Sequence, residues 1–201
     1  MNYGFVKLPL VPVRAADNEC SEMTTQLLFG EYVKIMEERE KWLYVENIQD
    51  GYQGWIDKKM IAITSESIVL KSRKMKVTKV CSPYALIHNQ VLNQGMLIPG
   101  GSLLYNLQGD VFDLCDQTWT LMDVNCVLNP LNQNADKNTC VEFLINTAMS
   151  YINTPYLWGG KSVLGIDCSG LVQTVYSIAE FSLPRDASQQ AQYGRPIESL
   201  S

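Results

Sequence analysis

One cysteine stands in a setting that suits a nucleophile. Cys168 lies within the run 165–170, which reads Gly-Ile-Asp-Cys-Ser-Gly, and apolar residues at helical spacing behind it predict a helix that begins at Asp167 or Cys168. A thiol in the first turn of a helix lies near the positive end of the helix dipole and near free backbone N–H groups, which favour the thiolate. The thiolate is the nucleophilic form, and the same N–H groups can stabilise a developing oxyanion. The alternative is that Cys168 is a small buried residue at the start of a packed helix.

Two further motifs flank this cysteine. Residues 156–160, Tyr-Leu-Trp-Gly-Gly, form a predicted loop before it, and Leu-Pro-Arg at 183–185 follows the predicted helix. Asp186 and Gln189 then have the spacing of a D-x-x-Q capping box, which predicts a short helix. The alternative for Tyr156 and Trp158 is that they simply pack within the loop.

Taken together, these motifs resemble the NlpC-type family of papain-like cell-wall peptidases. The shared elements are the Tyr-x-Trp-Gly-Gly loop, the Asp-Cys-Ser-Gly run, Leu-Pro-Arg and the glutamine pair at 189–190. The first 64 residues resemble a bacterial SH3-like barrel, with its Val-x-Val-Arg start, Gly-Glu-x-Val-x-Ile strand and Gly-Trp-Ile ending. The order of the units resembles the YkfC-like, or dipeptidyl-peptidase VI-like, branch, in which two such barrels precede the catalytic domain. The resemblance covers essentially the whole chain, and the second barrel matches by position more than by motif.

The resemblance implies a cysteine endopeptidase that hydrolyses the bond between γ-D-glutamate and the following diamino acid in murein peptides. Cys168 is then the nucleophile, and Tyr156 helps to hold the oxyanion or the substrate carbonyl. Asp167 and Ser169 contact the peptide beside the scissile bond, and Trp158 forms a wall of the pocket. The sequence does not distinguish diaminopimelate from lysine as the diamino acid.

The first barrel also contributes to the implied site. Glu22 and Tyr52, together with Asp167, correspond to residues that receive the free amino group of a leading L-alanine. An ammonium group has three donors and requires acceptors with negative charge around it. We therefore expect Glu22, Tyr52 and Asp167 to converge beside Cys168 and to close one end of the cleft. The alternative is that Glu22 is a solvated turn residue and Tyr52 a ring on the barrel surface.

The chain departs from the family pattern in its histidines. The family's general base is a histidine downstream of the nucleophile, whereas the one histidine of this chain is His88, in the second β region. We therefore expect the 201 residues to be a truncated form that lacks the histidine half and is inactive as it stands. Two alternatives to the peptidase are a non-catalytic protein that binds wall peptides and a pair of SH3-like modules that act as an adaptor.

The composition excludes several classes of function. A net charge of −5 and a pI near 4.9 argue against a nucleic-acid partner. No apolar run approaches the ~18 residues that cross a bilayer, so no membrane insertion is expected. Six scattered cysteines and one histidine predict reduced thiols, no metal site and no cofactor. The start of the chain lacks the pattern of a signal peptide, which favours the cytoplasm, with the periplasm as the alternative if a signal was removed.

The expected fold class is α+β, with two small SH3-like β-barrels followed by a partial papain-like domain. Residues 1–64 and 65–128 are the two predicted barrels, with a strand at 67–70 among others, and residues 129–201 the nucleophile half of the peptidase domain. A helix is predicted over 139–150, capped by Asn134 or Asp136. Because the truncated domain lacks sheet strands, we expect Leu171, Val175 and Ile178 to be exposed or covered by another chain.

Overall fold

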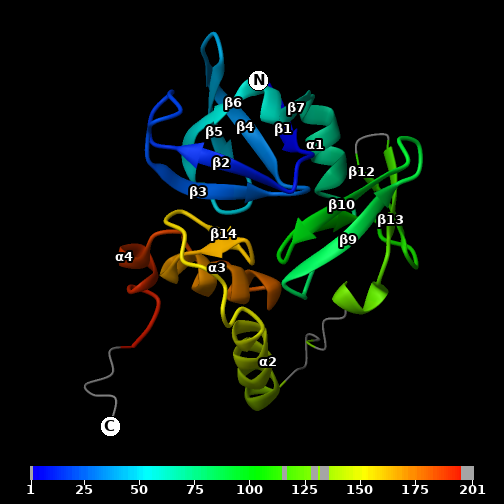
Figure 1. The fold of residues 1–201 in the computed structure, drawn as a ribbon, viewed down its shortest axis with the longest axis vertical. Coiled ribbons are helices and arrows are strands. Elements are labelled where there is room, and N and C mark those ends of the chain that lie inside the picture. Colours follow the sequence, from blue (N-terminus) through cyan, green and yellow to red (C-terminus); the bar gives the residue numbers. More distant parts are fainter. Residues whose placement is uncertain (1, 115–116, 128–130, 132–135, 196–201) are drawn as a thin grey trace.

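The first part of the chain is one antiparallel sheet. A computed structural model describes residues 2–114, 117–127, 131 and 136–195 (Figure 1). Seven strands form the sheet in the order β3-β2-β6-β5-β4-β1-β7. Their bounds are β1 Tyr3–Val6, β2 Leu10–Arg14, β3 Met23–Leu28, β4 Tyr32–Glu38, β5 Trp42–Asn47, β6 Gln53–Asp57 and β7 Ile61–Thr64, with a 3₁₀ turn at Lys58–Met60. Alternate side chains of β5 are buried, as the two-residue period of a strand requires.

A second β unit follows after a short helix. Its strands are β8 Val77–Lys79, β9 Tyr84–Asn89, β10 Gln94–Pro99, β11 Leu103–Tyr105, β12 Val111–Leu114 and β13 Gln117–Leu121, and a 3₁₀ turn spans Val124–Val127. They form a four-stranded sheet, β10-β9-β13-β12, and a two-stranded sheet, β11-β8. The strand predicted at 67–70 is wrong, because helix α1 covers Glu66–Ser72. The buried residues of α1, Val69 and Ser72, are three positions apart, which is the spacing of a helix face.

The two β units share a hydrophobic core. Phe29, which follows β3, packs edge-on against Phe112 and Trp119 of the second unit, with ring centroids 6.4 and 5.7 Å away. A smaller cluster around Val11, Val33 and Ile56 belongs to the first unit alone. The predicted division at residues 64 and 128 stays a prediction, since the core crosses the first boundary and residues 128–130 lie outside the described residues.

The rest of the described chain has three helices and two short strands, which confirms the α+β class. Its elements are α2 Lys137–Met149, β14 Lys161–Ser162, β15 Gly165–Ile166, α3 Cys168–Ile178 and α4 Ala187–Gln190. The Asp136 side chain caps α2 by accepting hydrogen bonds from two backbone N–H groups, and Asn134 lies outside the described residues. In Figure 1, β14 and α3 lie beneath the first sheet, and α2 points away from both β units.

The expected exposure of α3 is wrong for two of the three residues. Val175 and Ile178 are buried within this chain, where α3 packs against α2 and β14, and Leu171 is half-buried. Exposed apolar side chains also lie on α2, where Val141, Ile145 and Met149 follow one another at four-residue spacing on one helix face. No helix in the described part of the chain is long and apolar enough to span a membrane.

Candidate active site

A pocket of about 290 Å³ opens at the N-terminus of α3. All seven residues that the sequence analysis placed in the site line it, although their roles remain predictions. The lining residues are Glu22, Thr24, Tyr52, Tyr156, Trp158, Asp167, Cys168, Ser169, Arg185, Asp186, Ala187 and Ser188. The first β unit, the 156–160 loop, α3 and the segment before α4 therefore meet around one thiol.

Cys168 is the first residue of α3, and its side chain is exposed. Asp167 is the N-cap and accepts a 2.7 Å hydrogen bond from the Gly170 amide, which satisfies one of the free donors of the first turn. Gly170 packs against the Gly160 carbonyl so closely that a Cβ at position 170 would overlap it. The start of the helix is thus braced by the loop that precedes the thiol.

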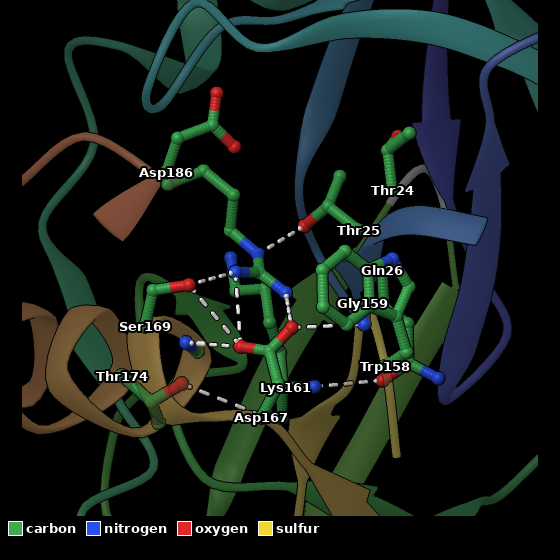
Figure 2. A network of polar contacts seen from close by, with 12 residues as sticks. Thr24, Thr25, Gln26, Trp158, Gly159, Lys161, Asp167, Ser169, Thr174 and Asp186 are labelled. Carbon is green, nitrogen blue, oxygen red and sulfur yellow. Dashed lines mark hydrogen bonds and ion pairs between the residues drawn. The ribbon is translucent and has the colours of Figure 1, made fainter. Parts of the chain in front are cut away.

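The Asp167 carboxylate is the centre of a buried polar network (Figure 2). Arg185 binds both of its oxygens, with Nη1–Oδ1 at 3.1 Å and Nη2–Oδ2 at 2.7 Å. The Gly159 amide donates to Oδ2 at 2.8 Å. Burial acts to raise the pKa of Asp167, but hydrogen bonds from Arg185, Gly170 and Gly159 outweigh it and hold the pKa below its usual range.

These contacts limit what Asp167 and Ser169 can offer a substrate. Both side chains are buried, and Ser169 Oγ accepts a 2.7 Å hydrogen bond from Arg185 and donates to Asp167. The charge of Asp167 is already paired with Arg185, whose Nε reaches Thr25 of β3 at 2.9 Å. The arrangement therefore serves to fix the helix start on the first β unit.

The 156–160 loop is joined directly to the first β unit. Trp158 Nε1 donates a 2.7 Å hydrogen bond to Glu22 Oε1. Gly159 has a φ of +76° and lies so close to the Met23 carbonyl that a side chain there would overlap it. A glycine is needed at this position for both reasons. Tyr156 is two-thirds exposed, so its hydroxyl is free to approach a ligand in the pocket.

Asp186 is a site residue that the sequence analysis missed. The expected capping box would use its side chain to cap α4, yet that side chain makes no capping hydrogen bond. Instead Oδ1 of Asp186 accepts a 3.3 Å hydrogen bond from the Tyr52 hydroxyl. Burial and the nearby Asp186 carboxylate raise the pKa of Tyr52. No local signal could have found this contact, because 134 positions separate the two residues.

No histidine lines the pocket in the part of the chain that the structure describes. His88 lies in β9, and its Nε2 forms a 3.1 Å hydrogen bond with Asn93. Cys20, Cys81, Cys126 and Cys168 are free thiols, and Cys115 lies outside the described residues. Within those same residues, no group of three or more His, Cys, Asp and Glu side chains could hold a metal ion.

Two known protein families match this chain, one in its first β unit and one around Cys168. Residues 13–61 match the bacterial dipeptidyl-peptidase Sh3 domain, and residues 153–200 match the NlpC/P60 family. The chain is 30% identical to dipeptidyl-peptidase 6 of Lysinibacillus sphaericus over 209 aligned positions, which cover 90% of this chain and 70% of that protein. It is 28% identical to a γ-D-glutamyl-L-lysine dipeptidyl-peptidase of Bacillus subtilis, with 86% of this chain and 59% of that protein covered.

Solved structures show the same fold. An NlpC/P60 family protein from Bacillus cereus superposes with a TM-score of 0.79 at 18% identity, over 98% of this chain and 78% of that one. An NlpC/P60 endopeptidase from Photobacterium damselae subsp. piscicida gives a TM-score of 0.69 at 20% identity, over 94% of this chain and 45% of that one. With an SH3-like region, the Asp-Cys-Ser-Gly helix start and a relative matched along most of its length, the chain belongs to the NlpC/P60 family.

Proposed function

We propose that this chain carries the nucleophile and the amine-recognition site of a cysteine peptidase. The substrate is a murein peptide with a free N-terminal L-alanine, and the bond attacked joins γ-D-glutamate to the diamino acid. The observation that carries the proposal is the single pocket in which Cys168 meets Glu22 and Tyr52 of the first β unit. The name of the Bacillus subtilis relative, a γ-D-glutamyl-L-lysine dipeptidyl-peptidase, supports the same bond.

In the proposed reaction the Cys168 thiolate attacks the γ-carbonyl carbon, and a C–S bond forms. The Tyr156 hydroxyl and the backbone N–H groups at the start of α3 stabilise the oxyanion. The C–N bond then breaks, the amine of the diamino acid leaves with a proton, and water hydrolyses the thioester to restore the thiol. The described lining residues include no imidazole to carry that proton, so we propose that this chain binds peptide but turns it over slowly.

The contacts favour Glu22 and Asp186 as the acceptors for the substrate ammonium group. Glu22 is exposed and uses one oxygen on Trp158, and Asp186 accepts only a 3.3 Å hydrogen bond from Tyr52. Asp167, by contrast, already bonds a guanidinium group and two amides. A site that pairs an ammonium group rejects a ligand without one, because its carboxylates would be desolvated without a counter-charge.

Isothermal titration of the tripeptide L-Ala-γ-D-Glu-L-Lys and of its N-acetyl form tests this proposal. We expect the free-amine peptide to bind at least tenfold more tightly, as charge-assisted hydrogen bonds of about 1.5–3 kcal/mol require. A Cys168→Ser chain serves as the control, since it removes the nucleophile and leaves the amine site intact. Equal affinities for the two peptides would refute the amine-recognition site.

A second candidate is a non-catalytic protein that binds wall peptides, which the absence of an imidazole from the described pocket favours. Mass spectrometry of a long incubation distinguishes the two functions. A peptidase releases L-Ala-D-Glu and the diamino acid, and Cys168→Ser abolishes the release. A binder retains the peptide unchanged. An SH3-like adaptor would bind its ligand elsewhere, so Glu22→Gln and Cys168→Ser would leave its binding unaltered.

A further inference from the structure

A second cavity, of about 80 Å³, lies where β14, α3 and the two β units meet. None of its lining residues lines the Cys168 pocket. Its polar lining includes Glu31 and Asp50 from the first β unit, Lys79 from β8, Lys161 from β14 and Gln173 from α3. The cavity thus lies at the junction that sets the position of α3 relative to the β units.

Lys161 is connected to the first β unit, to α3 and to β15. Its amide donates a 2.9 Å hydrogen bond to Gln26 of β3, and its carbonyl accepts one of 3.4 Å from Thr174 of α3 (Figure 2). Lys161 also pairs with Ile166, the residue before Asp167, across β14 and β15. The backbone at Lys161 therefore joins the first β unit to the strand that leads into the nucleophile.

Lys161 lines the cavity, and its ammonium group has no direct protein partner there in the described part of the chain. Only 5% of the residue is exposed, and among the described residues its ammonium group forms no hydrogen bond or ion pair. Glu31 is equally buried and close enough for the charge of Lys161 to act on it. Burial raises the pKa of Glu31, and the Lys161 charge opposes that rise. An ammonium group without a protein partner needs another polar neighbour, and the cavity that Lys161 lines can supply water.

The cavity lining also includes a hydrogen-bond acceptor, Gln173 Oε1, that receives no hydrogen bond within the described structure. Gln173 is 3% exposed, and its Nε2 donates to Asp50 and to the Leu183 carbonyl, both at 3.1 Å. Its Oε1 is buried and has no hydrogen bond within the described structure. Buried polar atoms of native proteins are almost always hydrogen-bonded, to protein or to ordered water.

The charges that line the cavity indicate what it can hold. The carboxylates of Glu31 and Asp50 would repel an anion, and the ammonium groups of Lys161 and Lys79 would repel a cation. Water both accepts from Lys161 and donates to Gln173 and Glu31, so it satisfies all three. At about 30 Å³ for each water, the cavity holds roughly two or three.

We propose that water in this cavity carries the interaction between Lys161 and Glu31, and that Lys161 is thereby a positioning residue for Cys168. The interaction holds β14, and with it the Asp167 cap and the first turn of α3, against the first β unit. The link to peptide affinity rests on the function proposed above, whereas the electrostatic and geometric parts do not. A crystal structure with ordered water between Lys161 and Gln173 is the expected result, and a dry cavity would overturn the hydrated link.

The electrostatic part is tested by the pH dependence of unfolding in urea. Lys161→Met leaves Glu31 buried without its cation and raises the unfolding equilibrium constant at pH 7 at least tenfold. Because the folded-state pKa of Glu31 is raised, the stability that its protonated form contributes is lost as pH rises through that pKa. The loss of unfolding free energy that Lys161→Met causes must therefore grow from acid to neutral pH. Adding Glu31→Gln to that variant must abolish this growth.

The other charged groups that face the cavity are Asp50, Lys79 and Glu180, and they are common to all these variants. If the loss of unfolding free energy in Lys161→Met does not depend on pH, Lys161 contributes only packing, and the proposal is overturned. Lys161→Arg keeps the charge and is expected to restore the wild-type profile. If Lys161→Met does not fold, Lys161→Gln provides the same comparison with a smaller loss.

The positioning part is tested by the rate at which iodoacetamide alkylates Cys168. Lys161→Met loosens the first turn of α3 and weakens the field of its N–H groups, so the rate falls at least threefold. The thiol is already exposed, so loosening adds little access. The exposed Cys20 is the internal control and keeps its rate. An unchanged Cys168 rate in a destabilised Lys161→Met chain would refute the positioning role.

Tripeptide affinity separates this proposal from the proposed function. If the wild-type chain binds the peptide, Lys161→Met is expected to weaken binding at least threefold and Lys161→Arg to restore it. If the wild-type chain binds no peptide, the proposed function fails, while the pH profile and the alkylation rate still decide the role of Lys161.

Discussion

The indole N–H of Trp158 donates a 2.7 Å hydrogen bond to Glu22, a residue 136 positions earlier in the chain. This contact joins the loop before Cys168 to the segment just before β3. Both side chains line the Cys168 pocket. The first β unit therefore forms part of the pocket wall, and changes in that unit should alter what the pocket binds.

Glu22→Gln is expected to weaken binding of the free-amine tripeptide about tenfold or more, since a charge-assisted hydrogen bond is worth about 1.5–3 kcal/mol. The glutamine oxygen can still accept from Trp158, so the wall of the pocket is preserved. Binding of the N-acetyl peptide should not change. Glu19→Gln is the matched control, because Glu19 pairs with Arg14 and does not line the pocket. An equal loss for both peptides would contradict a role in amine recognition.

Arg185→Met should be strongly destabilising. Arg185 is 2% exposed and forms a two-pronged ion pair with Asp167, so its loss leaves a buried carboxylate without a counter-charge. Breaking such a pair costs about 3–5 kcal/mol of unfolding free energy. Arg39→Met is the control, since Arg39 pairs with Asp17 on the surface, where solvent screens an ion pair and it contributes little to stability. Similar midpoints of urea unfolding for the two variants would contradict this account of Arg185.

Asp167 makes the chain sensitive to acid. Its folded-state pKa is lowered, so its contribution to stability is present above the pKa of the unfolded chain and is lost as pH falls through the folded-state value. Asp167→Asn should lower the melting temperature at pH 7. In a plot of melting temperature against pH, the fall below pH ~4, the ordinary pKa of Asp, should be less steep for this variant than for the wild-type chain. If the melting temperatures of the two proteins fall in parallel below pH ~4, other carboxylates dominate the acid sensitivity of the chain.

Cys168 should react fastest of the described thiols. At pH 7 we expect iodoacetamide to label it several-fold faster than Cys20, which is also exposed but does not lie at a helix N-terminus. Cys81 should label slowest, because burial raises its pKa to about 11. Peptide mass spectrometry over a time course measures all three rates. Equal rates at Cys20 and Cys168 would remove the evidence for an activated thiol.

Local sequence predicts the secondary structure around Cys168 well. The helix start at Cys168 and the loop at 156–160 follow from residue types and spacing, because caps, glycines and helical periodicity are local features. The prediction of a strand at 67–70 was wrong because a short apolar run fits a helix as well as a strand. In the structure this run forms α1, which buries Val69.

Contacts across the chain could not be predicted in this way. The Tyr52–Asp186 hydrogen bond and the buried position of Lys161 depend on how the first β unit packs against α3, and no periodicity in either segment encodes that packing. The exposure of Val175 and Ile178 was predicted wrongly for the same reason, because other elements of this chain, α2 and β14 among them, pack against α3. Asp167 was expected at the substrate, but Arg185, 18 positions later, takes its charge.

Covalent capture tests the central claim most directly, namely that Cys168 is a nucleophile placed beside an amine-recognition site. The probe is L-Ala-γ-D-Glu with its γ-carbonyl converted to a chloromethyl ketone, which a thiolate attacks with loss of chloride to form a thioether. We expect saturable modification of Cys168 alone, slowed by the free tripeptide and at least tenfold slower for the N-acetyl probe. Modification of Cys20 at the same rate, or equal rates for the two probes, would contradict the account.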